Sequence, residues 1–153
     1  MSETKHVQND RVNCRVGGSI DDFSVCLRVY GKEVVPSEIT RMSGAVPTYQ
    51  HSLGDRISNR SENLRSFGMW HMERCGSAPA QICDLIEQVL SELPASSEFW
   101  EPLRKLGKLD LYCSVRIRSE NRGFSLPVAT MQHLAERGIE FAADIWCETD
   151  DAT

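Results

Sequence analysis

The fold prediction starts from the stretch Leu109-Asp-Leu-Tyr-Cys-Ser-Val-Arg-Ile-Arg118. Its Leu, Cys, Val and Ile side chains alternate with Asp, Tyr, Ser and Arg side chains. This period of two is typical of a strand that has one buried face and one face nearer to water. A helix pattern follows over residues 126–137, and a second strand pattern follows over 139–147. We therefore predict a strand–helix–strand unit near the C-terminal end of the chain.

A similar unit occurs near the start of the chain. Residues 22–30 alternate as a strand, and Pro36–Ser43 is predicted as a short helix that ends at Gly44. Proline suits the first turn of a helix, and glycine suits the residue after the last turn. The second unit has the same order, with a helix that starts at Pro127 and stops at Gly138. The two units indicate a weak internal repeat.

The middle of the chain supplies two more strands and two helices. Residues 46–51 and 69–74 are predicted as an antiparallel pair of strands around a long polar, irregular loop. Residues 80–93 form the most regular helix pattern, with apolar residues on a single face, and residues 98–106 are predicted as a shorter helix. The predicted order is therefore β-α-β-β-α-α-β-α-β.

This order favours an α+β fold, a two-layer α/β sandwich with a mixed sheet and helices on one face. A ferredoxin-like arrangement is the leading prediction, and a duplicated ferredoxin-like arrangement stays open. The alternative is a mixed sheet with helices on both faces. The alternating strands argue against it, because strands covered on both sides are usually continuous apolar runs.

The length of 153 residues fits one domain. We assign residues 21–148 to this domain, residues 1–20 to a flexible N-terminal tail and residues 149–153 to an acidic C-terminal tail. Alternation of Val12, Cys14 and Val16 leaves a short edge strand as an alternative within the first tail.

Charge and composition limit the classes of partner. The net charge of −5 disfavours general binding to nucleic acid phosphates, and it is compatible with a basic protein partner. No apolar run is long enough to span a bilayer, and the N-terminus lacks the apolar core of a secretory signal. We expect a cytoplasmic protein. Its six cysteines show no zinc spacing and are expected to be reduced thiols, so we expect no metal and no cofactor.

The long loop and its borders form the candidate binding site. The residues assigned to it are His51, Asp55, Arg56, Arg60, Arg65, Trp70 and His71. Arginines near an aromatic ring can bind a carboxylate or phosphate while the ring stacks on a planar ligand. The alternative is a solvated loop whose arginines pair with acidic neighbours and whose Trp70 belongs to the core. We assign no catalytic residues, because no recognisable catalytic motif is present.

Asp144 interrupts the last predicted strand. We expect it to pair with Arg116 or Arg118 on the neighbouring strand, which would be ordinary cross-strand pairing.

Several separate segments also match one family pattern in the expected order. They are Phe23–Gly31, Pro36–Gly44, Pro47-Thr48, the loop with Gly54 and Arg60, Gly68-Met69-Trp70, and Leu134-Ala-Glu-Arg-Gly-Ile-Glu-Phe-Ala-Ala-Asp-Ile-Trp146. With these segments the chain resembles a bacterial family of domains of unknown function, number 4279, over about residues 22–147. The resemblance implies a small stand-alone bacterial protein and supplies no catalytic residues. By analogy, small acidic proteins of this kind serve as immunity or partner-binding proteins in toxin systems.

Two functional hypotheses follow. The first is a non-enzymatic binding protein, an immunity-type inhibitor that binds a protein partner such as a basic toxin domain. The second is a small-ligand sensor or enzyme that uses the polar Arg/Trp loop at 50–71. The sequence leaves the identity of the partner or ligand and the oligomeric state open.

Overall fold

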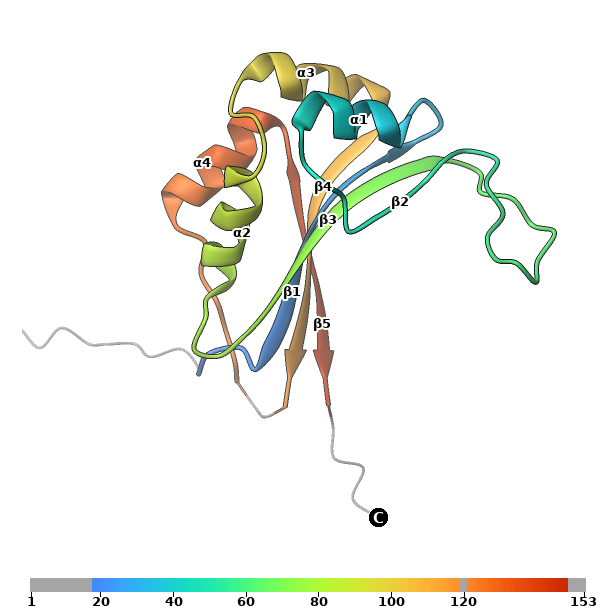
Figure 1. The fold of residues 1–153 in the computed structure, drawn as a ribbon. Coiled ribbons are helices and arrows are strands. Elements are labelled where there is room, and N and C mark those ends of the chain that lie inside the picture. Colours follow the sequence, from blue (N-terminus) through green and yellow to red (C-terminus); the bar gives the residue numbers. More distant parts are fainter. Residues whose placement is uncertain (1–17, 119–120, 149–153) are drawn as a thin grey trace, which may run out of the picture.

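The computed structural model describes residues 18–118 and 121–148, which form one α+β unit (Figure 1). In chain order its elements are β1 (Asp22–Gly31), α1 (Pro36–Ser43), β2 (Tyr49–His51), β3 (Gly68–Ser77), α2 (Ile82–Ser91), α3 (Ser97–Leu106), β4 (Lys108–Ile117), α4 (Val128–Arg137) and β5 (Glu140–Cys147). The predicted order of strands and helices is confirmed, and α2, α4 and β2 are shorter than predicted while β3 is longer.

The strands form one mixed sheet in the order β2-β3-β1-β4-β5. β1 pairs antiparallel with both β3 and β4, β2 pairs antiparallel with β3, and β4 pairs parallel with β5. The first four strands, with α1 and α2, therefore have the strand order of a ferredoxin-like unit. α4 and β5 extend that unit by one parallel strand. The described residues hold this single extended sheet and no second copy of it.

The helices lie on one face of the sheet, as Figure 1 shows, so the alternative with helices on both faces is wrong. The helix-facing side chains of β1 are the alternating apolar residues Phe23, Val25, Leu27 and Val29, and all four are buried. They pack in one core with the apolar face of α2 and with Trp100 of α3. Burial of the alternating residues is the reason that the strand pattern predicts this layer correctly.

The helix boundaries follow the proline and glycine signals. α1 begins at Pro36 and ends before Gly44, which has a φ of 67° and donates its N–H to the carbonyl of Thr40 over 2.9 Å. α4 ends before Gly138, which has a φ of 66°. A left-handed conformation is accessible to glycine without a Cβ clash, so both helices stop where the sequence predicts.

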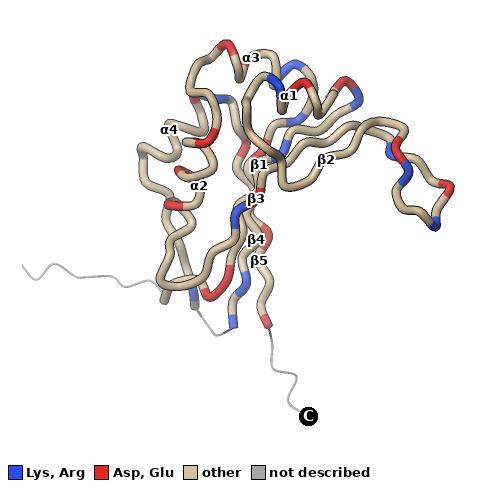
Figure 2. Tube along the Cα trace, in the orientation of Figure 1, with Lys and Arg blue, Asp and Glu red and all other residues tan. Residues whose placement is uncertain are grey.

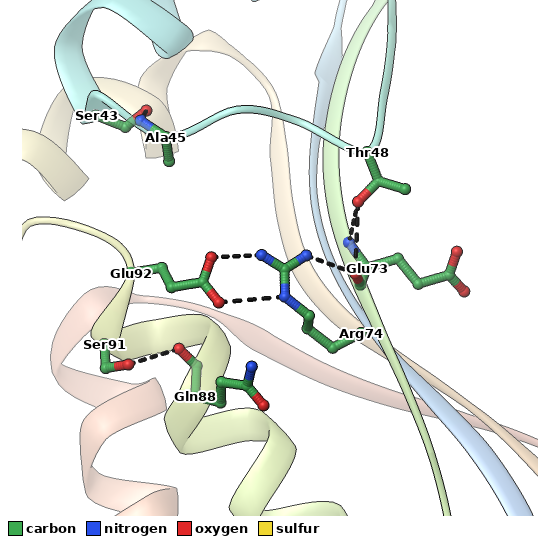
Figure 3. A network of polar contacts seen from close by, with 8 residues as sticks. All are labelled: Ser43, Ala45, Thr48, Glu73, Arg74, Gln88, Ser91 and Glu92. Carbon is green, nitrogen blue, oxygen red and sulfur yellow. Dashed lines mark hydrogen bonds and ion pairs between the residues drawn. The ribbon is translucent and has the colours of Figure 1, made fainter.

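The polar side chains of Glu73 and Arg74, which are consecutive on β3, point to opposite sides of the strand (Figure 3). Arg74 points to the helix side and binds Glu92, just after α2, through Nε over 3.1 Å and through a second bond from Nη2. The carboxylate of Glu73 points to the opposite side of the strand. Thr48 fixes the strand position, because its Oγ1 accepts the N–H of Glu73 over 2.9 Å. Neighbouring residues of β3 therefore point to opposite faces of the sheet, Arg74 to the helices and Glu73 to the face without helices.

The N-terminal boundary lies close to the predicted one. Ile20, which we assigned to the tail, is buried in the core, and Gly18 donates its N–H to the carbonyl of Asn121 over 3.2 Å. Residues 1–17 of the predicted N-terminal tail (1–20) and the whole predicted C-terminal tail (149–153) lie outside the described residues. The alternative edge strand with Val12, Cys14 and Val16 lies outside them as well. The described cysteines are free thiols. Within residues 18–118 and 121–148, none of the helices is long and apolar enough to cross a membrane.

Candidate functional site

The sheet face that points away from the helices is uncovered by any described element (Figure 1), and we call it the open face. Because side chains alternate along each strand, the registers decide which residues lie on this face. They include Tyr49 and His51 from β2, Met69, His71 and Glu73 from β3, Ser24, Cys26, Arg28 and Tyr30 from β1, Lys108, Asp110, Tyr112, Ser114 and Arg116 from β4, and Glu140, Asp144 and Trp146 from β5. Aromatic and charged side chains therefore dominate this surface.

A hollow of about 360 Å³ lies on the open face. Its lining residues come from four adjacent strands: Ser24, Cys26, Arg28, Tyr49, Met69, His71, Glu73, Tyr112 and Ser114. The ladder places His71 between Tyr49 on one side and Arg28 on the other. The hollow is thus a direct product of strand pairing and contains residues that are far apart in the sequence.

Arg28 lines this hollow and is held in place by Asp110. The two residues are opposite each other on β1 and β4, and the guanidinium donates two bonds of 2.7 and 2.8 Å to the carboxylate. Asp110 is fully buried and also accepts a bond of 3.2 Å from the hydroxyl of Tyr30. The bond to Asp110 raises the pKa of Arg28. The guanidinium carbon lies 4.2 Å from the centre of the Tyr112 ring, so it is stacked as well as paired.

A second polar group continues the network toward β5. Tyr112 donates its hydroxyl to Asp144 over 2.8 Å, and this bond raises the pKa of Tyr112. Trp146 donates its indole N–H to the same carboxylate oxygen over 3.1 Å. The carboxylate of Asp144 therefore joins Tyr112, which lines the hollow, to Trp146 on β5.

The predicted pairing of Asp144 with Arg116 or Arg118 is wrong. The parallel register of β4 and β5 places Asp144 beside Ser114, whereas Arg116 lies beside Trp146. Both arginines instead approach Glu148, at 3.4 Å and 3.6 Å. The sequence pattern indicated which residues share a face, but the register decides which of them are neighbours.

Burial shifts the pKa values of two ionisable groups of the hollow, Cys26 and His71. Burial, with a smaller contribution from Glu73, raises the pKa of the Cys26 thiol to about 12, so this sulfur is protonated at neutral pH. Burial lowers the pKa of His71, so its imidazole is neutral at pH 7. Among the described residues Glu73 has no ion-pair partner within 4.0 Å. The unpaired charge of the hollow is therefore negative and belongs to Glu73.

The long loop between β2 and β3 has more structure than we predicted. Backbone bonds fold it back on itself, from Gly54 to Arg65 over 2.9 Å, from Arg65 to Asp55 over 2.7 Å and from Ile57 to Asn63 over 3.0 Å. Figure 1 shows this hairpin-like excursion projecting from the sheet, and Figure 2 shows both signs of charge along it. The expectation of an irregular loop is therefore wrong, because backbone pairing needs no apolar alternation.

The structure brings some of the predicted site residues together and separates others. Tyr49 connects His51, His71 and Arg65: its ring centre lies 5.6 Å and 5.3 Å from the two imidazoles, and its hydroxyl accepts a bond of 3.0 Å from Arg65. Asp55 shapes the base of the loop, because its Oδ2 accepts the N–H of Ser52 over 2.6 Å.

The remaining three predicted residues lie elsewhere. Arg56 and Arg60 are exposed on the projecting part of the loop. Trp70 faces the helices, is 1% exposed and donates its indole N–H to Thr40 Oγ1 over 3.1 Å. Trp70 therefore belongs to the core and cannot stack on a ligand that is bound on the open face.

Sequence reasoning missed the central residues of the open face: Arg28, Glu73, Asp110 and Tyr112. For Arg28, Asp110 and Tyr112 the signal was present, because each of them occupies a polar position in an alternating strand pattern. Their proximity in space could not be inferred from the sequence, because it depends on β1 lying between β3 and β4 in the sheet.

The geometry defines a class of protein, a small α+β domain with an extended ferredoxin-like sheet and an open aromatic and charged face. The model of one family matches residues 21–148, and its description reads Domain of unknown function (DUF4279). The chain belongs to this family, as the resemblance implied. No curated protein matches the chain. No solved structure matches it either.

Proposed function

We propose that this protein is a non-enzymatic bacterial binding protein that docks a protein partner on its open face. The observation that carries the proposal is the extent and chemistry of this face, which spans five strands and presents Arg28, Tyr49, Tyr112 and Trp146. Trp, Tyr and Arg are the residue types that contribute most of the binding energy at protein interfaces. Trp146 is 61% exposed, although its indole orientation is fixed by Asp144.

A basic partner fits the charge of this face. The positive charge of Arg28 is already neutralised by Asp110, whereas Glu73 is unpaired within the described residues. A lysine or arginine side chain of the partner would meet Glu73 and the rings of Tyr49 and Tyr112 in the hollow. The net charge of −5 would in addition speed up association with a basic domain. We therefore propose the role of an immunity-type inhibitor of a basic toxin domain.

The protonation states favour binding over catalysis. A nucleophilic cysteine needs a lowered pKa, and the pKa of Cys26 is raised to about 12. Two hydrogen bonds already pair the guanidinium of Arg28 with Asp110, so it is less able to bind the carboxylate or phosphate of a substrate. The free thiols of the described residues suit a reducing compartment, and we place the proposed binding protein in the cytoplasm.

The test is affinity capture followed by reconstitution with the purified partner. The full chain is compared with Glu73→Lys on the open face and with the matched variant Glu101→Lys, which reverses the charge of an exposed residue on α3. We expect a basic protein that binds the unmodified chain and the α3 variant equally, and binds Glu73→Lys at least about tenfold more weakly by calorimetry.

Two outcomes contradict parts of this proposal separately. If Glu101→Lys abolishes binding and Glu73→Lys does not, the partner docks on the helices and the open face is the wrong surface. If the partner binds the open face but does not impair growth when it is produced alone, the immunity-type role fails and the docking role stands.

The size of the hollow favours a second candidate function, a small-ligand sensor or enzyme. A volume of about 360 Å³ lies within the range of ligand pockets. In this case an aromatic metabolite would raise the melting temperature of the chain, and Tyr112→Ala would remove the increase. Arg60→Ala would leave it unchanged, because Arg60 lies on the projecting loop. A metabolite-library thermal scan without a hit would exclude this candidate for the compounds scanned.

A further inference from the structure

β5 is an edge strand whose outer backbone groups are free among the described residues. Glu148, directly after β5, donates its N–H to the carbonyl of Ile117 on β4 over 2.9 Å. Because backbone groups alternate in direction along a strand, the even-numbered residues of β5 also turn their N–H and C=O groups toward β4. Successive residues of a strand alternate, and the odd-numbered residues Phe141, Ala143 and Ile145 therefore turn their N–H and C=O groups outward. Asp144 is the one charge between Glu140 and Cys147.

The opposite edge of the sheet is protected in a way that β5 is not. β2 has three residues, Tyr49–His51, and is followed directly by the projecting loop. Short edge strands and charged residues prevent unwanted pairing in many proteins. β5 has eight residues, no lysine and no proline. Of its side chains, Ile145 is 58% exposed on the side of the helices.

α4 presents an apolar stripe on the same edge. Leu134 is buried against the sheet, and the helix turns about 100° per residue, so His133 and Ala135 lie on opposite sides of it. His133 faces α2, because its Nδ1 lies 3.0 Å from Glu87 of that helix. The side of Ala135, which also carries Val128 and Met131, therefore faces away from α2 and toward the edge formed by β5. Val128 is 75% exposed and Met131 is 47% exposed.

We propose that this edge binds a second copy of the same chain, with β5 pairing antiparallel to β5 of the other copy. The two-fold axis passes through Ala143, so that Ala143 pairs with itself and Phe141 pairs with Ile145. These residues have the outward backbone groups, and each such pair exchanges two N–H···O=C bonds. The stripes of the two α4 helices lie on the same side of the sheet and are covered by the same contact.

The charges of β5 select this register. A shift of two residues in one direction places Asp144 opposite Asp144 of the other copy. A shift of two residues in the other direction places it opposite Glu140. Like charges directly opposite are destabilising. In the register centred on Ala143, Asp144 faces Ala142 and Glu140 faces Trp146, whose neighbour on β4 is Arg116. The strand is thus self-complementary in one register and repulsive in the two adjacent ones.

The dimer joins the two open faces into one continuous surface and leaves the hollow of each copy free. It is independent of the identity of any partner, and it requires no contact from the residues that line the hollow. If the chain does not form this dimer, the proposed docking function is unaffected. If no partner docks on the open face, the proposed dimer is likewise unaffected.

Light scattering of the full chain after size-exclusion chromatography tests this proposal. At about 100 µM we expect a mass of twice 17.2 kDa that falls toward the mass of one chain on dilution. Ala143→Pro removes an outward N–H that the dimer needs and the β4–β5 ladder does not use. Ala135→Lys places charge in the α4 stripe. Each variant should weaken the dimer at least about tenfold.

The matched control is Ala129→Lys, an exposed alanine of α4 outside the stripe, which should retain the dimer. If Ala143→Pro fails to fold, Ala135→Lys decides the outcome. A single-chain mass for the unmodified protein at about 100 µM overturns the proposal. So does a dimer that persists in Ala135→Lys, or one that dissociates equally in Ala129→Lys.

Discussion

Arg28 on β1 and Asp110 on β4 lie directly opposite each other and form two parallel hydrogen bonds of 2.7 and 2.8 Å on the side of the sheet that has no helices. The Asp110 side chain is 1% exposed and the Arg28 side chain is 24% exposed. Bidentate arginine–carboxylate pairs are among the stronger hydrogen-bonded contacts in proteins. The pair also holds the guanidinium against Tyr112, so it organises the centre of the open face.

Asp110→Ala should destabilise the fold strongly. The change leaves Arg28 without its main partner in a largely buried position, and breaking a buried charge pair costs about 3 kcal/mol of unfolding free energy. Urea denaturation monitored by circular dichroism measures this loss. Arg116→Ala, which breaks an exposed pair with Glu148 at 3.4 Å, should cost less than about 1 kcal/mol. Equal losses in the two variants would show that the central pair has no special role.

Replacement of both partners separates stability from binding. The double variant Arg28→Met with Asp110→Leu fills the space with apolar atoms and leaves no unpaired charge, so its stability should return to within about 1–2 kcal/mol of the unmodified chain. It should still bind the partner more weakly, because the stacking of Arg28 on Tyr112 is lost. Calorimetric binding that is unchanged in the folded double variant would remove Arg28 from the docking surface.

Trp70 and Trp146 should respond in opposite ways to substitution by alanine. Trp70 is 1% exposed in the core, so Trp70→Ala should cost about 3–5 kcal/mol of unfolding free energy. Trp146 is 61% exposed, so Trp146→Ala should cost less than about 1 kcal/mol and mainly weaken partner binding. Denaturation and calorimetry on the same samples distinguish the two roles. A stable Trp70→Ala variant with lost ligand binding would restore the sequence-based assignment of Trp70 to the site.

The fold was largely predictable because its layer pattern is local. Alternation in β1 and β4 and the apolar face of α2 each follow from burial of one side of an element, and Gly44 and Gly138 mark where helices stop. Which strands are neighbours in the sheet was harder to predict from the sequence, since strand pairing depends on contacts between distant segments. The pairing of β1 with both β3 and β4 decides the sheet order, and no single segment contains that information.

The candidate site was predictable only in part, for a related reason. A concentration of arginine and histidine in one segment is visible in the sequence, and His51, Arg65 and His71 do meet around Tyr49. Arg28 and Asp110, in contrast, are 82 residues apart and meet only through strand pairing. Trp70 was assigned to the site because it is an aromatic residue close in sequence to the loop arginines. Consecutive strand residues point to opposite faces, however, and Trp70 faces the helices.

The buried cysteines should resist modification. The pKa values of Cys26 and Cys113 are both raised to about 12, chiefly by burial, whereas Cys75 and Cys147 are exposed. Because the thiolate is the reactive form, the two buried thiols should react with a disulfide reagent at pH 8 much more slowly than the exposed pair. Mass spectrometry after timed quenching assigns each site. Rapid modification of Cys26 in the native state would instead identify it as a reactive thiol of the hollow.

His51 should make the fold less stable as the pH falls. It is buried between Tyr49 and Phe67 at the base of the loop, and desolvation, followed by the charge of Arg65, lowers its pKa. A histidine whose folded pKa lies below its unfolded value of about 6.5 binds fewer protons in the folded state. Stability is therefore fully present above about pH 6.5 and decreases as the pH falls through the lower folded pKa.

The variant His51→Phe tests this dependence, because phenylalanine fits among the two aromatic rings and cannot be protonated. Urea denaturation between about pH 7.5 and pH 5 should show that the variant gains stability relative to the unmodified chain as the pH falls. Some decrease should remain, since burial also lowers the pKa of His71. His51→Phe combined with His71→Phe should flatten the curve further. Parallel curves for the unmodified chain and His51→Phe would show that His51 is not the group whose protonation opposes folding.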